Sequence, residues 1–243
     1  MDILSEESCQ AAVAQVLADY GRLDVVVHNA AHLFIGFSEA FTPEQLASSL
    51  NTNVVGAHHL NRAALPAMRA QEAGLLLYVG SGISRVVYPF MAPYVVGKTA
   101  LDALAEATAY EVGQFGIETT ILMPGVFTDG TDHFKAAEFV QDTATVAAYE
   151  RLQADFDNGD ASLQRLFRPG QDVPVQGVAD EIARVLALPA GQRPRRTTVD
   201  YSDYGAEAVN AVAEAQTARI FHIIGYDHLL KAAVPASVAE AAQ

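Results

Sequence analysis

Ser81, Tyr94 and Lys98 are three residues whose types and spacing could carry out acid–base chemistry. Tyr94 and Lys98 stand four positions apart, so on a helix the phenol and the ammonium point to the same side. A free tyrosine has a pKa of about 10, too high for a base at neutral pH, and a neighbouring cation lowers that pKa because it favours the phenolate. The Ser81 hydroxyl could then hold a carbonyl oxygen while the tyrosine transfers a proton.

The elements around these residues favour a shared site. Residues 75–79 form an apolar run of the length and character of a strand buried on both faces, and the run ends in Gly80-Ser81-Gly82. Open α/β sheets bind their ligands at this carboxyl edge. Tyr94 begins a helix that continues through Leu101. A tyrosine–lysine pair by itself is more often a solvated helix face, but the serine at the strand end favours the functional interpretation.

This combination resembles the short-chain dehydrogenase/reductase family, whose catalytic residues correspond to Ser81, Tyr94 and Lys98. The resemblance implies an NAD(P)-dependent oxidoreductase that interconverts a secondary alcohol and a ketone, with a small carbonyl or alcohol compound as substrate. Ser81 would hold the carbonyl oxygen, Tyr94 would donate the proton, and Lys98 would lower the tyrosine pKa and bind the nicotinamide ribose. The sequence does not indicate whether NAD or NADP is preferred.

The same resemblance assigns a fourth catalytic residue. In Asn51-Thr52-Asn53-Val54-Val55-Gly56, Asn53 stands three positions before the glycine and fits the family's N-x-x-G better than Asn51 does. It would hold a proton-relay water at a helix distortion beside the catalytic lysine. A polar residue in the middle of a helix is the structural alternative, and the other three residues in register favour the functional one.

Further residues correspond to cofactor contacts of the family. Residues 28–31 read H-N-A-A where the family has N-N-A-G, a match at Asn29 and Ala30 and a departure at His28 and Ala31. The turn that follows strand 117–123 would contact the nicotinamide. The cofactor-binding positions implied in this way are Asp2 (at the adenine), Asn29, Ala30, Ala31, Tyr94, Lys98, Pro124, Gly125 and, at an offset that varies in the family, Thr128.

The family's glycine-rich turn, G-x-x-x-G-x-G, does not occur in the sequence. That turn presents backbone N–H groups to the cofactor pyrophosphate. We therefore expect the chain to be truncated at its N-terminus relative to the family, by two βα units or roughly 60 residues. The strand at 23–27 would then be an exposed sheet edge. The chain could be a fragment of a longer enzyme, or a cofactor-free or inactive relative that acts as an interaction subunit.

The alternation of apolar runs and helical patterns predicts an α/β fold, a doubly wound Rossmann-type parallel sheet with helices on both faces. Residues 1–243 are expected to form a single domain, with 129–175 as a helical substrate lid lined by aromatic residues and 232–243 as a tail. Residues 2–4 are expected to be the end of a strand, and further strands are expected at 23–27, 75–79, 117–123 and 197–200. The main helices are expected at 5–20, 42–73, 94–113, 175–188 and 206–231, the last packing through Val209, Val212, Ile220 and Ile223.

Composition restricts the partners. A net charge of -14 argues against nucleic acid and against an anionic membrane surface. No apolar run approaches the ~20 residues of a membrane-spanning helix, and the N-terminus has no secretion signal, so a cytoplasmic location is expected.

Cys9 is the single cysteine and no metal-ligand spacing is present, so no metal site is predicted. The alanine-rich helices at 42–73 and 93–113 predict a homo-oligomer, a dimer or tetramer.

Overall fold

A four-stranded parallel sheet forms the centre of the computed structural model, which describes residues 1–234. The strand order is β1-β3-β4-β6, with β1 at Val25–His28, β3 at Gly74–Val79, β4 at Ile117–Pro124 and β6 at Arg196–Val199. All three pairings are parallel. The predicted α/β fold with a parallel sheet is confirmed, and β1 is one edge of this sheet.

The prediction that residues 2–4 are the end of a strand is wrong, because this segment is a turn. The Asp2 carboxylate accepts a hydrogen bond from the backbone N–H of Leu4 at 2.9 Å, and Ser5 then caps the helix by accepting from the backbone N–H of Ser8. Such local side-chain bonds compete with strand pairing. The helix that follows, α1 at Glu6–Tyr20, ends at Gly21 as expected.

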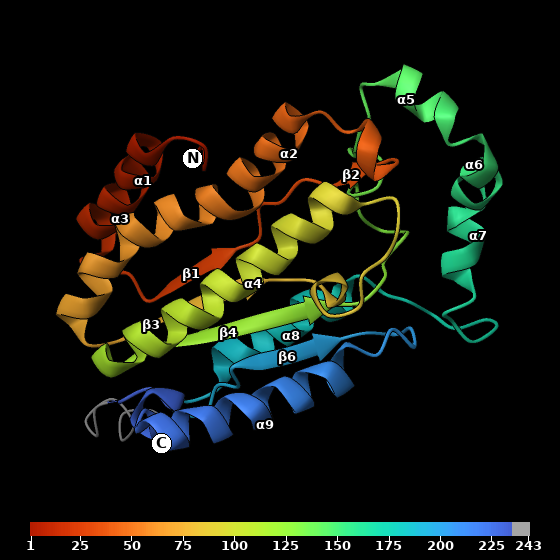
Figure 1. The fold of residues 1–243 in the computed structure, drawn as a ribbon. Coiled ribbons are helices and arrows are strands. Elements are labelled where there is room, and N and C mark those ends of the chain that lie inside the picture. The colour runs from red at the N-terminus through yellow and green to blue at the C-terminus, as the bar shows by residue number, and fades with distance from the viewer. Residues whose placement is uncertain (235–243) are drawn as a thin grey trace.

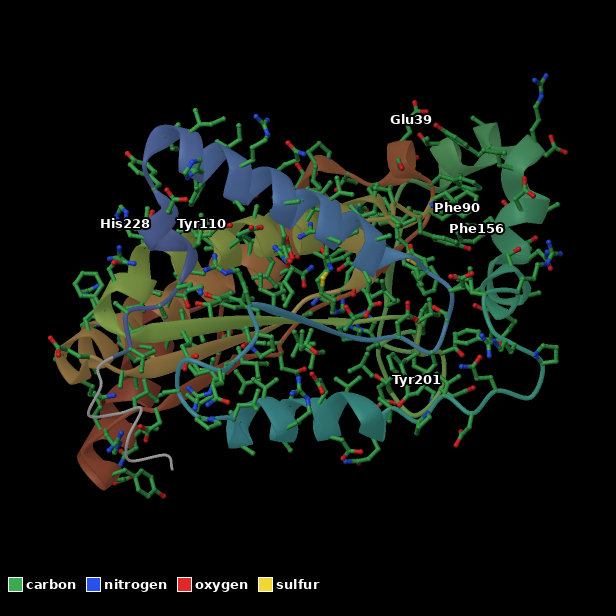
Figure 2. The ribbon with its side chains drawn as sticks, turned by 90° about the horizontal axis from the view of Figure 1, so that it is seen from below. Glu39, Phe90, Tyr110, Phe156, Tyr201 and His228 are labelled. Carbon is green, nitrogen blue, oxygen red and sulfur yellow. The ribbon has the colours of Figure 1, made fainter. Side chains whose placement is uncertain are left out.

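Helices lie on both faces of the sheet (Figure 1). On one face α1 and α3 (Gly56–Gln71) pack beside α4 (Ala92–Val112), over a core to which β1, β3 and β4 contribute. On the opposite face α8 (Gln176–Ala187) packs through Val185 against Leu75 and Leu77. Figure 2 shows α8 and α9 on opposite sides of the strands. Strand β3, in which residues 75–78 are all buried, therefore keeps the continuous apolar character expected of a strand covered on both faces.

The predicted helix at 42–73 consists of three consecutive segments. Thr42 caps α2 (Pro43–Leu50) with a full capping box that includes Gln45. The segment Asn51–Val55 is a π-helix, and α3 continues from Gly56. A π segment widens the helix by one residue and is often found at functional sites. Its position at Asn53 agrees with the helix distortion that the sequence resemblance implies.

Helix α9 (Ala206–Ile224) packs on the body of the protein through a different side from the one predicted. Val209, Val212, Ile220 and Ile223 are exposed by 40% to 65%. The inward face instead carries Ala206 and Asn210, which are buried, and Phe221, whose ring lies 4.8 Å from that of Tyr110. The reason is that Asn210 finds polar partners on the body of the protein, and these fix the rotation of the helix. A short 3-10 helix, η5 (Asp227–Leu230), follows α9.

A helical arm occupies much of the predicted lid segment 129–175. It contains α5 (Thr143–Ala148), α6 (Glu150–Asp157) and α7 (Gly159–Gln164), and it lies at one side of the molecule near the two-stranded ribbon of β2 (Phe34–Ile35) and β5 (Glu138–Phe139) (Figure 1). Phe156 of the arm contacts Phe37 and Phe90, and Phe90 and Phe156 lie side by side in Figure 2. These aromatic rings attach the arm to the body.

Within residues 1–234 no helix combines the length and the apolar character needed to cross a bilayer. Over the same range, no group of three or more histidine, cysteine or acidic side chains is arranged to hold a metal ion. Of the predicted tail at 232–243, residues 235–243 lie outside the described part of the chain.

Candidate active site

A cavity of about 500 Å³ opens at the carboxyl ends of the parallel strands. The segments that follow β1, β3 and β4 each contribute to its wall, and so does the first turn of α4. Ser81, Tyr94 and Lys98 all line this cavity. The structure therefore brings the three predicted catalytic side chains to one place, at the edge of the sheet where ligands of open α/β folds bind.

Lys98 is held at the end of β3. Its ammonium donates a hydrogen bond to the backbone carbonyl of Val79 at 2.9 Å, and its Nζ lies 5.9 Å from the centroid of the Tyr94 ring. The side chain is buried, and this burial lowers the pKa of Lys98 to about 8. The cation is thus fixed beside the phenol, as the four-residue spacing predicts.

The expected lowering of the Tyr94 pKa by Lys98 is not found. Burial raises the pKa of Tyr94 to about 12, and the Ser81 hydroxyl opposes that rise only in part. Both groups lie away from water, and a low-dielectric environment disfavours the phenolate as well as the ammonium. Tyr94 is consequently protonated at neutral pH and can act as a proton donor.

Ser81 begins the turn that follows β3. Its backbone is extended, and its hydroxyl accepts a hydrogen bond of 3.3 Å from the backbone N–H of Ile83, which starts the short 3-10 helix η3 (Gly82–Ser84). The Ser81 carbonyl accepts from the hydroxyl of Ser84 at 2.9 Å. These local bonds fix the serine at the cavity wall, where its hydroxyl acts on the pKa of Tyr94.

Asn53 clamps the chain segment that follows β1. Its amide oxygen accepts from the backbone N–H of His32 at 2.9 Å, and its amide nitrogen donates to the His32 carbonyl at 3.1 Å and to Ser49 at 3.2 Å. A Cβ atom at Gly97 would lie 3.1 Å from the Asn53 side chain, so a glycine there lets α4 approach the π segment closely. The side-chain amide of Asn53 is thus occupied by the His32 backbone and the Ser49 hydroxyl.

The predicted cofactor residues divide into two groups. Asn29, Ala30, Ala31, Pro124 and Gly125 line the cavity, together with Tyr94 and Lys98. The other two are not part of its wall. Asp2 lies in the turn before α1, and the hydroxyl of Thr128 accepts a hydrogen bond of 3.4 Å from Gln164 of α7.

Sequence reasoning did not single out His32, His133 or Tyr204, which also line the cavity. His133 packs on Tyr94, with 5.3 Å between ring centroids. Tyr204 follows β6, and its hydroxyl donates to the carbonyl of Val86 at 2.7 Å. His133 lies in the segment assigned to a lid, where the resemblance offers no motif. No signal in the sequence identifies these positions.

A buried network of ion pairs connects three elements near the cavity. Asp102, one helical turn after Lys98, accepts hydrogen bonds from Arg85 at 2.6 Å and from Arg196 at 2.5 Å. Arg85 directly follows the 3-10 turn that begins at Ser81, and Arg196 begins β6. The network therefore joins the serine turn, the lysine helix and the last strand.

Comparison with known proteins agrees with this arrangement. An uncharacterized oxidoreductase of Schizosaccharomyces pombe is 28% identical over 203 residues, which is 83% of this chain and 80% of that protein. The crystal structure of a short-chain dehydrogenase from Streptomyces avermitilis matches with a TM-score of 0.68 at 26% identity, over 93% of this chain and 79% of that one.

A second solved structure shows the fold alone, because its identity is 20%. It is the alcohol dehydrogenase of the archaeon Thermococcus sibiricus complexed with 5-hydroxy-NADP, with a TM-score of 0.63 over 84% of this chain and 73% of that one. The family model described as short chain dehydrogenase matches residues 1–158, which is more than half of the sequence. The chain therefore belongs to the short-chain dehydrogenase family.

Proposed function

We propose that the chain is an NAD(P)-dependent oxidoreductase that interconverts a secondary alcohol and a ketone. The observation that carries the proposal is the convergence of Ser81, Tyr94 and Lys98 on one cavity at the carboxyl edge of the sheet. A structural role does not require a buried lysine, a buried phenol and a serine hydroxyl around the same space, since each charged or polar group costs free energy when it leaves water.

The cavity wall fits the nicotinamide half of the cofactor. Lys98 and Tyr94 offer polar groups for the ribose, and Ala30, Ala31 and the Pro124-Gly125 turn leave room for a flat ring. A bound nicotinamide would supply or accept the hydride. The structural neighbour solved with 5-hydroxy-NADP supports this assignment, and the preference between NAD and NADP stays open. The sequence contains no G-x-x-x-G-x-G turn that could bind the pyrophosphate.

In the reductive direction the substrate carbonyl oxygen accepts hydrogen bonds from Ser81 and Tyr94. As the reacting carbon becomes tetrahedral, the Tyr94 hydroxyl passes its proton to that oxygen, and Lys98 stabilises the phenolate that remains. The proton that Tyr94 loses must be replaced from solvent. Asn53 contributes by holding the His32 backbone at the cavity wall, and a relay water at its carbonyl remains part of the proposal.

Replacing Tyr94 with phenylalanine tests the proposal. Reduction of simple ketones by NADH and NADPH is followed through the absorbance of the reduced nicotinamide, with Tyr20→Phe as the control because Tyr20 is exposed at the far end of α1. Loss of the transferable proton should lower kcat by about 10²- to 10⁴-fold, while thermal unfolding stays unchanged. A Tyr94→Phe protein that keeps more than about a tenth of the activity contradicts the assigned role.

A cofactor-free interaction subunit is the second candidate. It is favoured by the open edge of β1, where Val27 is 40% exposed, and by the lack of a glycine-rich turn in the sequence. Calorimetric titration with NADH and NADPH separates the two functions. We expect weak binding, since the pyrophosphate loses its main backbone donors. A low-micromolar dissociation constant contradicts that expectation, and no binding at millimolar cofactor favours the interaction subunit.

A further inference from the structure

His133 lies directly against the proposed proton donor. Its imidazole ring packs on the ring of Tyr94 with 5.3 Å between centroids and 60° between planes, and both side chains line the cavity together with Ser81. Phe134 makes an edge contact with the same ring, with 6.1 Å between centroids. The imidazole is therefore located where a group close to the reacting carbonyl of a substrate would lie.

The loop that carries His133 is held in place. The backbone N–H of His133 donates to the hydroxyl of Thr131 at 3.2 Å, and the N–H of Glu138 donates to the carbonyl of Leu33 at 2.8 Å where β5 pairs with β2. The C-terminal end of the segment 131–138 is thus held by the body of the protein, and the Thr131 hydroxyl shapes the turn at His133. A side chain on an anchored loop can select substrates, because its position does not adapt freely to each one.

The ring nitrogens of His133 remain available for a ligand. Within residues 1–234 neither ring nitrogen forms a hydrogen bond with the protein, although the backbone N–H does. Burial lowers the pKa of His133 to about 4, and the neighbouring Lys98 and His32 side chains lower it further. The imidazole is neutral at pH 7 and offers one donor and one acceptor. This pair suits an uncharged hydroxyl or carbonyl, and the neutral ring supplies no charge to balance a carboxylate.

We propose that His133 hydrogen-bonds a second oxygen of the substrate, on the carbon beside the reacting carbonyl. The inference rests on the proposed function and deepens it: the substrate class is an α-hydroxy ketone or a 1,2-dicarbonyl compound, or the corresponding alcohol. Tyr94 and Ser81 would hold the first oxygen, and His133, which packs on Tyr94 and lines the same cavity, would bind the oxygen on the adjacent carbon. The apolar side chains of Phe127 and Leu163 elsewhere in the wall receive the hydrocarbon part.

Two ketones of one ring size test the inference, 2-hydroxycyclohexanone and cyclohexanone, each with NADH and with NADPH. His133→Phe keeps a ring against Tyr94 and removes both nitrogens, whereas His133→Asn keeps a donor and an acceptor. His58→Asn, at an exposed position of α3, is the matched control. We expect His133→Phe to lower kcat/KM about tenfold for the hydroxyketone, mainly through KM, which is the loss of one hydrogen bond. Cyclohexanone should change by less than about twofold, and His133→Asn should restore part of the difference.

Three kinetic results overturn the inference. An equal loss with both ketones means that His133 acts on Tyr94 or on the proton transfer and does not select the substrate. No loss with the hydroxyketone means that the second oxygen is not bound there. A preserved preference for the hydroxyketone in His133→Phe has the same meaning.

A binding measurement decides the inference when turnover is absent. If the wild-type chain reduces neither ketone, that result counts against the proposed function, and the histidine ring signals in ¹H–¹³C spectra are then followed. The His133 signal is identified by its loss in His133→Phe. Addition of 2-hydroxycyclohexanone should shift this signal, and cyclohexanone should shift it less. Equal shifts with both ketones, or no shift with the hydroxyketone, overturn the inference.

Discussion

Acid should destabilise the fold through His28, the residue that departs from the family motif at the end of β1. Its ring is buried and stacks on Tyr78 with 4.3 Å between centroids and 15° between planes. Among the described residues its Nε2 atom has no hydrogen-bond partner. Burial lowers the pKa of His28 from 6.5 to about 4, because an imidazolium in this position would lose its hydration.

The direction of the pH effect follows from the two pKa values. Between about pH 6.5 and pH 4 the unfolded chain binds a proton at His28 and the folded chain does not, so the free energy of unfolding decreases as the pH falls. The full stability is present above pH 6.5. With 1.36 kcal/mol per pKa unit, the loss reaches about 3 kcal/mol below pH 4 and about 2 kcal/mol at pH 5.

Urea unfolding followed by circular dichroism at about pH 7.5 and pH 5 measures this loss. Because carboxylates and His133 also titrate, the useful quantity is the difference between the wild type and His28→Phe, which keeps an aromatic ring on Tyr78. The wild type should lose about 2 kcal/mol more than His28→Phe over this interval. His222→Phe, at an exposed position of α9, should behave as the wild type. Equal losses in the wild type and in His28→Phe would refute the argument from burial.

The remaining predictions concern the lysine, the arm and the assembly. Lys98→Met should shift the pH dependence of alcohol oxidation to higher pH and weaken nucleotide binding, and an unchanged pH profile contradicts the role given to its charge. Phe156→Ala should release the helical arm, so that limited proteolysis cuts α5–α7 faster than in the control variant Phe139→Ala, which changes an exposed residue. Equal cleavage rates in the two variants would mean that the aromatic contacts do not hold the arm. Light scattering at micromolar concentration should show a dimer or tetramer formed through α2, α3 and α4, and a clean monomer counts against it.

Much of the central sheet could be predicted because its signals are local. The apolar run at 75–79 fixes β3, and the end of β3 fixes the place of Ser81 at the ligand edge. The spacing of Tyr94 and Lys98 fixes their common orientation as soon as the helix exists. These inferences need only the periods of strands and helices, which any stretch of the sequence carries within itself.

The orientation of α9 could not be predicted in the same way. Apolar side chains cover a wide arc of this helix, so hydrophobic periodicity does not select one side. The deciding contacts are long-range: Asn210 accepts from Arg85 at 2.6 Å and donates to the sulfur of Met123 at 3.2 Å. The same limit applies to His133. Its proposed role depends on contact with Tyr94, which lies 39 positions earlier in the sequence.

The proton affinity of Tyr94 shows how burial changes a conclusion that residue spacing suggests. A cation four residues away predicts a lowered pKa, but the pocket that brings the two groups together also removes them from water, and burial has the larger effect. A phenol with a pKa of about 12 is a protonated donor at neutral pH, which suits the reduction of a ketone. In the oxidative direction Tyr94 must first give up this proton. The buried Lys98, with its ammonium fixed on the Val79 carbonyl, is the group placed to stabilise the phenolate, so the pH above which oxidation proceeds depends on that cation.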